Sequence, residues 1–147
     1  MPDTTSQQLV VFSLGSEEYA LPIGAVHEII RFTEPRSVAS EDAWIRGVIG
    51  LRGKIIPIFD LAARMELDRG DSEPGKIVIV ETPAGQVGVM VDEVEEVLTV
   101  GPEQLDAVPT ANRDSIEAIA KIEDRLVILL NPEGLFRRSA AEDLSAA

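Results

Sequence analysis

The feature that most constrains the fold of this 147-residue chain is an internal repeat. When the chain is shifted by 68 residues in its first part and by 71 in its second, apolar residues fall on apolar residues in several separate segments. The superimposed segments are 10–12 with 78–80, 19–32 with 87–100, 45–48 with 116–119, and 55–59 with 126–130. Alternating apolar residues match easily by chance, but a register kept over several segments is typical of a true repeat. The sequence therefore predicts two copies of one unit of about 60 residues.

Each copy consists of short segments that are rich in valine and isoleucine and separated by glycine-containing turns, a pattern typical of antiparallel strands. The first copy predicts strands at Leu9–Leu14, Tyr19–Ile23, Trp44–Leu51 and Ile55–Leu61. One copy is too small to form a sufficient core alone. We therefore expect an all-β protein in which two small β-barrels pack around a shared apolar core.

We expect one domain over residues 8–137 with two lobes. The first lobe is expected mainly from residues 8–69 and the second mainly from residues 76–137, with a glycine- and proline-containing linker between them. Residues 1–7 and 138–147 are expected to be flexible or peripheral tails.

Composition and charge exclude several classes of function. Cysteine is absent, which excludes disulfides and thiolate-bound metals. No apolar run approaches the roughly 20 residues of a membrane-spanning helix, and the first eight residues do not resemble a signal peptide, so a cytoplasmic protein is expected. The net charge of −13 repels nucleic acid and anionic lipid. Residues 31–54 nevertheless hold five basic against three acidic side chains, which indicates a local surface for one particular partner.

The basic side chains of this window include a compact Arg52-Gly53-Lys54 motif between two apolar runs. As local structure it predicts a hairpin tip, with a positive φ at Gly53 and two charges that keep the turn solvated. The matching tip in the second copy is Glu123-Asp124-Arg125, which is acidic and has no glycine. Since the turn can form without Arg52, the difference between the copies favours a binding role for this arginine.

The sequence offers little catalytic chemistry. His27 is the only histidine and no nucleophile motif or phosphate-binding loop is present, so we expect no enzyme activity and no cofactor. The acidic run Asp92–Glu96 could hold a hard cation, which prefers oxygen ligands. It lacks the glycine-turned loop of a calcium site, and a charged strand edge that resists aggregation explains it better. We therefore expect no metal site.

Four segments together resemble the CheW family, the adaptor proteins of bacterial chemotaxis. They are VVFSLGSEEYALPIGAVHEIIR, IRGVIGLRGKIIPIFDL, GQVGVMVDEVEEVL and AIAKIEDRLVILLN, and the resemblance runs from about Gln8 to Phe136. It implies two intertwined, five-stranded, SH3-like barrels around a common hydrophobic core. It also implies a non-enzymatic scaffold that joins the cytoplasmic tip of a chemoreceptor, a methyl-accepting chemotaxis protein, to the regulatory domain of a CheA-type histidine kinase. Such an adaptor is expected in receptor arrays at the inner membrane.

The resemblance also implies site residues. The receptor-facing candidates are Val26, Glu28, Gly47 and Arg52. The kinase is expected to contact an exposed apolar edge of the second lobe, with Ile77 and Val97 as candidates.

Two departures from the family pattern concern the receptor groove. Gly50 stands where the family usually has asparagine, and Glu41-Asp42-Ala43 replaces the proline often found just before Trp44. Two alternatives stay open. One is an adaptor of a non-flagellar pathway for surface motility or development, which only its partners distinguish. The other is a small ligand-binding β-barrel or a metal-dependent enzyme, which predicts an enclosed polar pocket and an ion near Asp92–Glu96.

Overall fold

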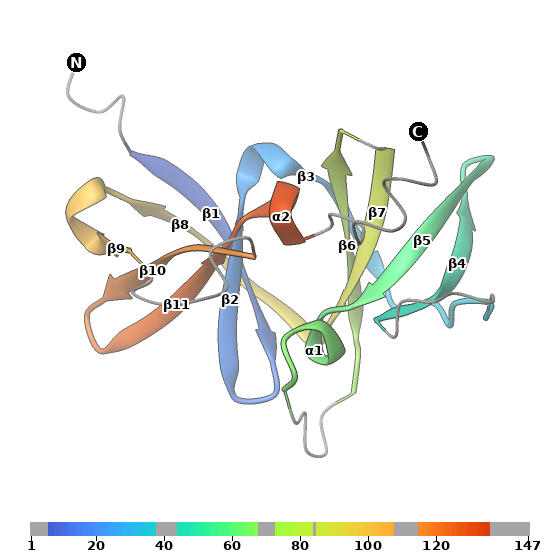
Figure 1. Ribbon diagram of the computed structural model, residues 1–147, viewed down its shortest axis with the longest axis horizontal. Coiled ribbons are helices and arrows are strands. Elements are labelled where there is room, and N and C mark those ends of the chain that lie inside the picture. The colour runs from blue at the N-terminus through green and yellow to red at the C-terminus, as the bar shows by residue number, and fades with distance from the viewer. Residues whose placement is uncertain (1–5, 38–43, 68–72, 84, 108–114, 136–147) are drawn as a thin grey trace.

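A computed structural model describes residues 6–37, 44–67, 73–83, 85–107 and 115–135 (Figure 1). Within these ranges eleven strands and two one-turn α-helices follow the order of the repeat, with 3₁₀ turns at Ile23–Ala25 and Pro102–Gln104. The strands are β1 Gln7–Leu14, β2 Glu17–Pro22, β3 Val26–Arg31, β4 Ile45–Leu51, β5 Lys54–Asp60, β6 Lys76–Thr82, β7 Gly85–Val91, β8 Glu93–Val100, β9 Leu105–Asp106, β10 Ile116–Ile122 and β11 Arg125–Leu130. The helices are α1 Leu61–Arg64 and α2 Pro132–Leu135.

The predicted repeat is visible element by element. The series β1, β2, β3, β4, β5, α1 recurs as β6, β7, β8, β10, β11, α2. The hydrogen bond that caps the start of each helix recurs as well, to the side chain of Asp60 in the first copy and of Asn131 in the second. Asp60 Oδ1 accepts the N–H of Ala63 and Asn131 Oδ1 accepts the N–H of Glu133, both at 3.1 Å.

The two sheets exchange strands between the copies. One sheet has the order β3-β6-β7-β5-β4 and is called lobe one here; the other has the order β8-β1-β2-β11-β10-β9 and is called lobe two. Each lobe therefore contains the first hairpin of one copy and the later strands of the other, and the two lie side by side (Figure 1). The expected all-β, intertwined architecture is confirmed. The assignment of residues 8–69 and 76–137 to separate lobes does not match the sheets, because β1 pairs with β8 and β3 with β6 across the copies.

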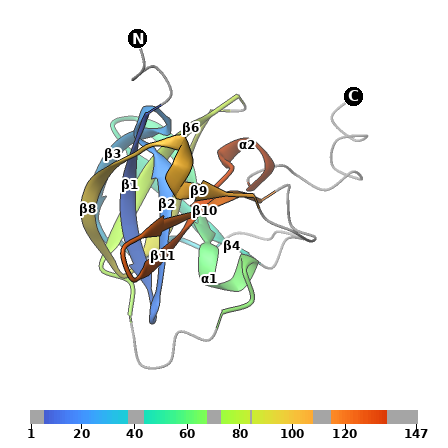
Figure 2. The same ribbon diagram turned by 90° about the vertical axis from the view of Figure 1, so that its left-hand side faces the viewer.

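β8 forms one edge of lobe two. Viewed from the side of lobe two, it runs beside β1 on the outside of the sheet (Figure 2). This position fits the charged strand edge that the acidic run predicts.

The apolar side chains form three layers. The central layer lies between the lobes and includes Phe12 and Tyr19, whose rings stack with centroids 6.4 Å apart. A second layer fills lobe one and a third fills lobe two. Strand β6 joins two of these layers, since Ile77 faces the interior of lobe one and Val78 faces the central layer. Burial of one large apolar side chain stabilises the fold by about 1.5–3 kcal/mol. The central layer, to which both lobes contribute such side chains, therefore holds the lobes together.

No helix within the described ranges is long and apolar enough to cross a membrane.

Candidate functional site

The sequence predicts a hairpin tip at Arg52-Gly53-Lys54, and the structure has one of two residues, because Lys54 already belongs to β5. Leu51 pairs with Lys54, and the two residues between them have positive φ, 51° at Arg52 and 81° at Gly53. Two positive φ angles are the signature of the tight turn that matches strand twist. The arginine side chain remains 67% exposed at this tip.

Arg52 forms an ion pair with Glu28, another of the predicted receptor-facing residues. Glu28 lies on β3, at the opposite edge of lobe one from β4, and its Oε1 lies 2.5 Å from Arg52 Nη1. The pair therefore links the two edges of the curled sheet. The hydrogen bond from Arg52 lowers the pKa of the Glu28 carboxyl, and the same bond raises the pKa of Arg52.

A histidine and a second glutamate extend this polar surface. His27 Nε2 lies 3.6 Å from Glu28 Oε1, and its Nδ1 lies 3.5 Å from Glu81 Oε2 on the adjacent strand β6. The side chains of His27 and Glu81 are about half exposed, which is typical of a solvated surface network and unlike a catalytic base in a closed site.

The other two receptor-facing candidates lie elsewhere. Val26 is half-buried at the start of β3 and packs against the central layer. Gly47 is buried at a bulge in β4, with φ of 154°. A Cβ on Gly47 would lie 2.2 Å from the carbonyl oxygen of Arg36, whose backbone bonds to Val48 in both directions. In the structure, the absence of a side chain at Gly47 lets the backbone at Arg36 pack closely against β4.

The two kinase-facing candidates differ in exposure to solvent. Ile77 has no exposed surface and packs inside lobe one, so the expectation that it lies at an exposed apolar edge is wrong. The sequence carried a signal for this, because the continuous apolar run Ile77–Val80 is typical of a strand buried on both faces. Val97 is 51% exposed on the edge strand β8. Its role in binding a kinase stays a prediction.

Lobe two contains an equivalent ion pair that the sequence comparison missed. Glu96, the counterpart of Glu28, has its Oε2 2.7 Å from Arg125 Nη1. Arg125 also donates from Nε and Nη2 to both carboxylate oxygens of Glu18, each at 3.0 Å. The 71-residue shift aligns Arg125 with Lys54, which concealed that Arg125 takes the place of Arg52 in the ion pair.

Exposed apolar side chains also recur at equivalent positions. Ile29 and Val97 are one such pair, and Ile55 and Leu126 are the other, with exposures of 41–72%. In lobe two, Val97 and Leu126 each follow directly after a member of the Glu96–Arg125 ion pair. The repeat shows that both copies keep an apolar residue at these positions, and the structure shows that neither copy buries it.

Side chains of the acidic run Asp92–Glu96 have partners within the protein. Asp92 Oδ2 accepts the N–H of Gly15 at 2.7 Å, and Glu96 pairs with Arg125. Among the described residues, no three histidine or carboxylate side chains are grouped as metal ligands.

The comparisons with known proteins agree with this geometry. Residues 8–140 match the model of the CheW-like domain. The chain belongs to the CheW family. A probable chemotaxis protein CheW of Rhizobium etli is 32% identical and a chemotaxis protein CheW of Bacillus subtilis 29%; the alignments cover 92% and 94% of this chain and 91% and 92% of those proteins. The crystal structure of the scaffolding protein TtCheW from Thermoanaerobacter tengcongensis superimposes with a TM-score of 0.83 at 32% identity, over 90% of this chain and 89% of that one.

Membership in the CheW family makes the departure at Gly50 worth locating. Gly50 is exposed on β4, and a Cβ built there has no heavy atom within 4 Å. There is therefore room for a Cβ at this exposed position, and glycine leaves no gap in the packing of the protein.

Proposed function

We propose that this CheW-family protein is a non-enzymatic chemotaxis adaptor that couples the cytoplasmic tip of a chemoreceptor to the regulatory domain of a CheA-type histidine kinase. The observation that carries the proposal is the exposed Arg52–Glu28 pair at a hairpin tip of a CheW-like fold.

The receptor contact rests on the donors of Arg52. A guanidinium has five N–H groups, and within the described residues only Nη1 donates, to Glu28. The ion pair orients the side chain, and its remaining donors face solvent at the tip. A planar fork of this kind suits carboxylates or carbonyls of a receptor helix. The exposed Ile55, three residues away, offers an apolar contact beside it.

The kinase contact is assigned to lobe two, where Val97 and Leu126 are exposed. The two partners would then bind to different lobes at the same time. An adaptor transmits receptor state to the kinase only if its contacts differ between the receptor states, because equal binding shifts no equilibrium. In this role the protein works in the cytoplasm, recruited to receptor arrays at the inner membrane.

The test is a titration of the purified protein against a chemoreceptor tip fragment and a kinase regulatory domain from the same organism. Arg52→Glu should weaken receptor binding at least about tenfold and leave kinase binding unchanged. Lys54→Glu is the matched control, since it makes the same charge change two residues away and Lys54 has no ion pair among the described residues. Val97→Glu should weaken kinase binding alone.

Absence of binding to both partners would refute the assignment to this pathway. Binding to a receptor and kinase of a surface-motility system would instead support the non-flagellar adaptor. If Arg52→Glu and Lys54→Glu weaken receptor binding equally, the hairpin tip acts through its net charge and Arg52 has no specific role.

A further inference from the structure

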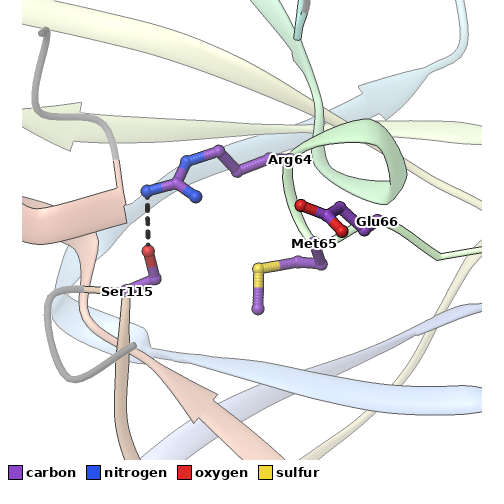
Figure 3. A pocket seen from close by; sticks show the side chains of 4 residues that line it. All are labelled: Arg64, Met65, Glu66 and Ser115. Atoms are coloured by element: carbon purple, nitrogen blue, oxygen red, sulfur yellow. Dashed lines mark hydrogen bonds between the residues drawn. The ribbon is translucent and has the colours of Figure 1, made fainter. Parts of the chain in front are cut away.

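A second polar feature lies away from the hairpin tip, where α1 of the first copy meets the start of β10 in the second. It is a cavity of about 190 Å³, lined by Arg64, Met65, Glu66 and Ser115 (Figure 3). Neither the predicted receptor surface nor the predicted kinase surface includes any of these residues.

Arg64 is held in place in this cavity by two contacts. Its guanidinium carbon lies 5.1 Å from the ring centroid of Trp44, and Nη2 donates to Ser115 Oγ at 2.8 Å. Trp44 and Ser115 are equivalent residues of the two copies, 71 positions apart. The arginine thus bridges matching positions of the repeat, and its orientation is fixed before any ligand binds.

No carboxylate of the described residues lies within ion-pair distance of Arg64, although Glu66 lines the same cavity. The comparison with Arg125 is informative, since that arginine is also half-buried and is paired with both Glu18 and Glu96. A partly buried, oriented guanidinium that has no ion pair within the described part of the chain is a favourable position for an anion.

Ser115 adds a second donor. It is 3% exposed, and its Oγ accepts the hydrogen bond from Arg64. A hydroxyl also donates one hydrogen bond, and no acceptor for that proton is found among the described residues. A buried donor without an acceptor costs about 1–3 kcal/mol, which a bound acceptor would recover.

We propose that this cavity binds a small organic monocarboxylate. One carboxylate oxygen accepts from the Arg64 guanidinium and the other accepts from the Ser115 hydroxyl. Glu66 also lines the cavity and repels each negative charge of a ligand, so a monoanion is favoured over a dianion. The bound anion would connect α1 of the first copy to β10 of the second and so strengthen the junction between the copies.

Trp44 makes the proposal directly testable, because it is the only tryptophan in the chain and stacks on Arg64. Sodium propionate is titrated into the full-length protein at constant ionic strength, with sodium chloride as the control salt. The expected result is a saturable change in tryptophan fluorescence with propionate only, together with a rise in melting temperature. Equilibrium dialysis with radiolabelled propionate measures the same binding without relying on the tryptophan.

In dialysis, Arg64→Gln should weaken propionate binding at least tenfold and Ser115→Ala should weaken it severalfold. Arg31→Gln is the matched control, because it removes one exposed positive charge elsewhere and should leave binding unchanged. A response that does not saturate, that chloride reproduces, or that survives in both Arg64→Gln and Ser115→Ala would overturn the proposal. Ser115→Ala removes a single oxygen, so the test stands even if Arg64→Gln does not fold. The assay uses neither receptor nor kinase, so its outcome is independent of the adaptor role.

Discussion

The two lobes make the same ion pair with different residues. In each lobe a glutamate on the third strand of a copy, Glu28 or Glu96, binds an arginine from the hairpin of β4–β5 or β10–β11. Lobe one takes the arginine from the turn itself, at Arg52. Lobe two takes it from the first position of the strand after the turn, at Arg125.

This shift in position changes what each arginine can do. Arg125 is 36% exposed and donates to two carboxylates, so most of its hydrogen-bonding capacity is used within the protein. Arg52 is 67% exposed and donates to one. The ion pair is therefore a shared structural feature of the fold, and the availability of the arginine to a partner is what distinguishes lobe one.

Gly47→Ala gives the largest expected difference between the lobes. The equivalent residue in lobe two is already alanine, Ala118, at an equivalent bulge. At Gly47 the new Cβ would meet the Arg36 carbonyl oxygen at 2.2 Å, in a backbone conformation that favours glycine. We expect a loss of about 3 kcal/mol in the free energy of unfolding, measured by urea denaturation.

Ala118→Gly is the control for that change and should cost no more than about 1 kcal/mol. Equal losses for the two variants would show that the Arg36 segment does not restrict Gly47.

The central layer also differs between the copies, since Tyr19 in the first corresponds to Val87 in the second. Burial, with a smaller contribution from Glu17, raises the pKa of Tyr19 from 10 to about 12. Because the folded state disfavours the ionised phenol, this contribution to stability is complete below pH 10 and is lost as the pH rises towards 12. The loss should be about 2 kcal/mol and absent in Tyr19→Phe.

Absorbance at 295 nm measures this ionisation at one site, because Tyr19 is the only tyrosine. A midpoint near pH 10 in the folded protein would contradict the buried position of the ring.

Arg125→Ala tests the structural role of the ion pair in lobe two. Glu18 and Glu96 would lose their shared partner, but all three side chains are partly exposed and solvent screens the loss. We expect about 1 kcal/mol of destabilisation in urea. Arg52→Ala, which breaks a more exposed single pair, should leave the urea midpoint almost unchanged.

The smallest expected effect is the loss of stability in lobe one at acidic pH, where Glu28 becomes protonated. The Arg52 hydrogen bond lowers the pKa of Glu28 from its ordinary value of 4.5. The pair therefore supports the folded state above that value and the support is lost as the pH falls through the lowered pKa. A carbon-detected NMR titration of the Glu28 carboxyl should show a midpoint below 4.5 that rises in Arg52→Gln. A midpoint that does not move would show that the pair does not persist in solution.

Much of the fold could be predicted because a strand has a recognisable pattern within its own short segment of sequence. Alternating apolar residues, the glycine at position 53 and the repeat gave the strands, the turn and the shared core. The exchange of strands between lobes was expected only from the resemblance to the CheW family, because alternation shows which residues face inward but not which strand lies alongside.

The site was predicted less completely, for a related reason. Glu28 and Arg52 were named separately as receptor-facing residues, and the structure joins them in an ion pair that the sequence did not predict. Ile77 is buried because β6 packs on two layers at once. Arg125 was missed because side-chain reach lets an arginine at the position of Lys54 replace one in the turn. The contact of Arg64 with Ser115 joins residues 51 positions apart and has no local sequence signal.

The most direct test of the contrast between the lobes is the affinity of a chemoreceptor tip fragment for Arg52→Ala measured beside Arg125→Ala. The proposed account predicts a loss of at least about tenfold for Arg52→Ala and no loss for Arg125→Ala, although the second variant is the less stable of the two. Equal affinities for both variants, or a greater loss with Arg125→Ala, would contradict the claim that the arginine in the turn is the one that meets the receptor.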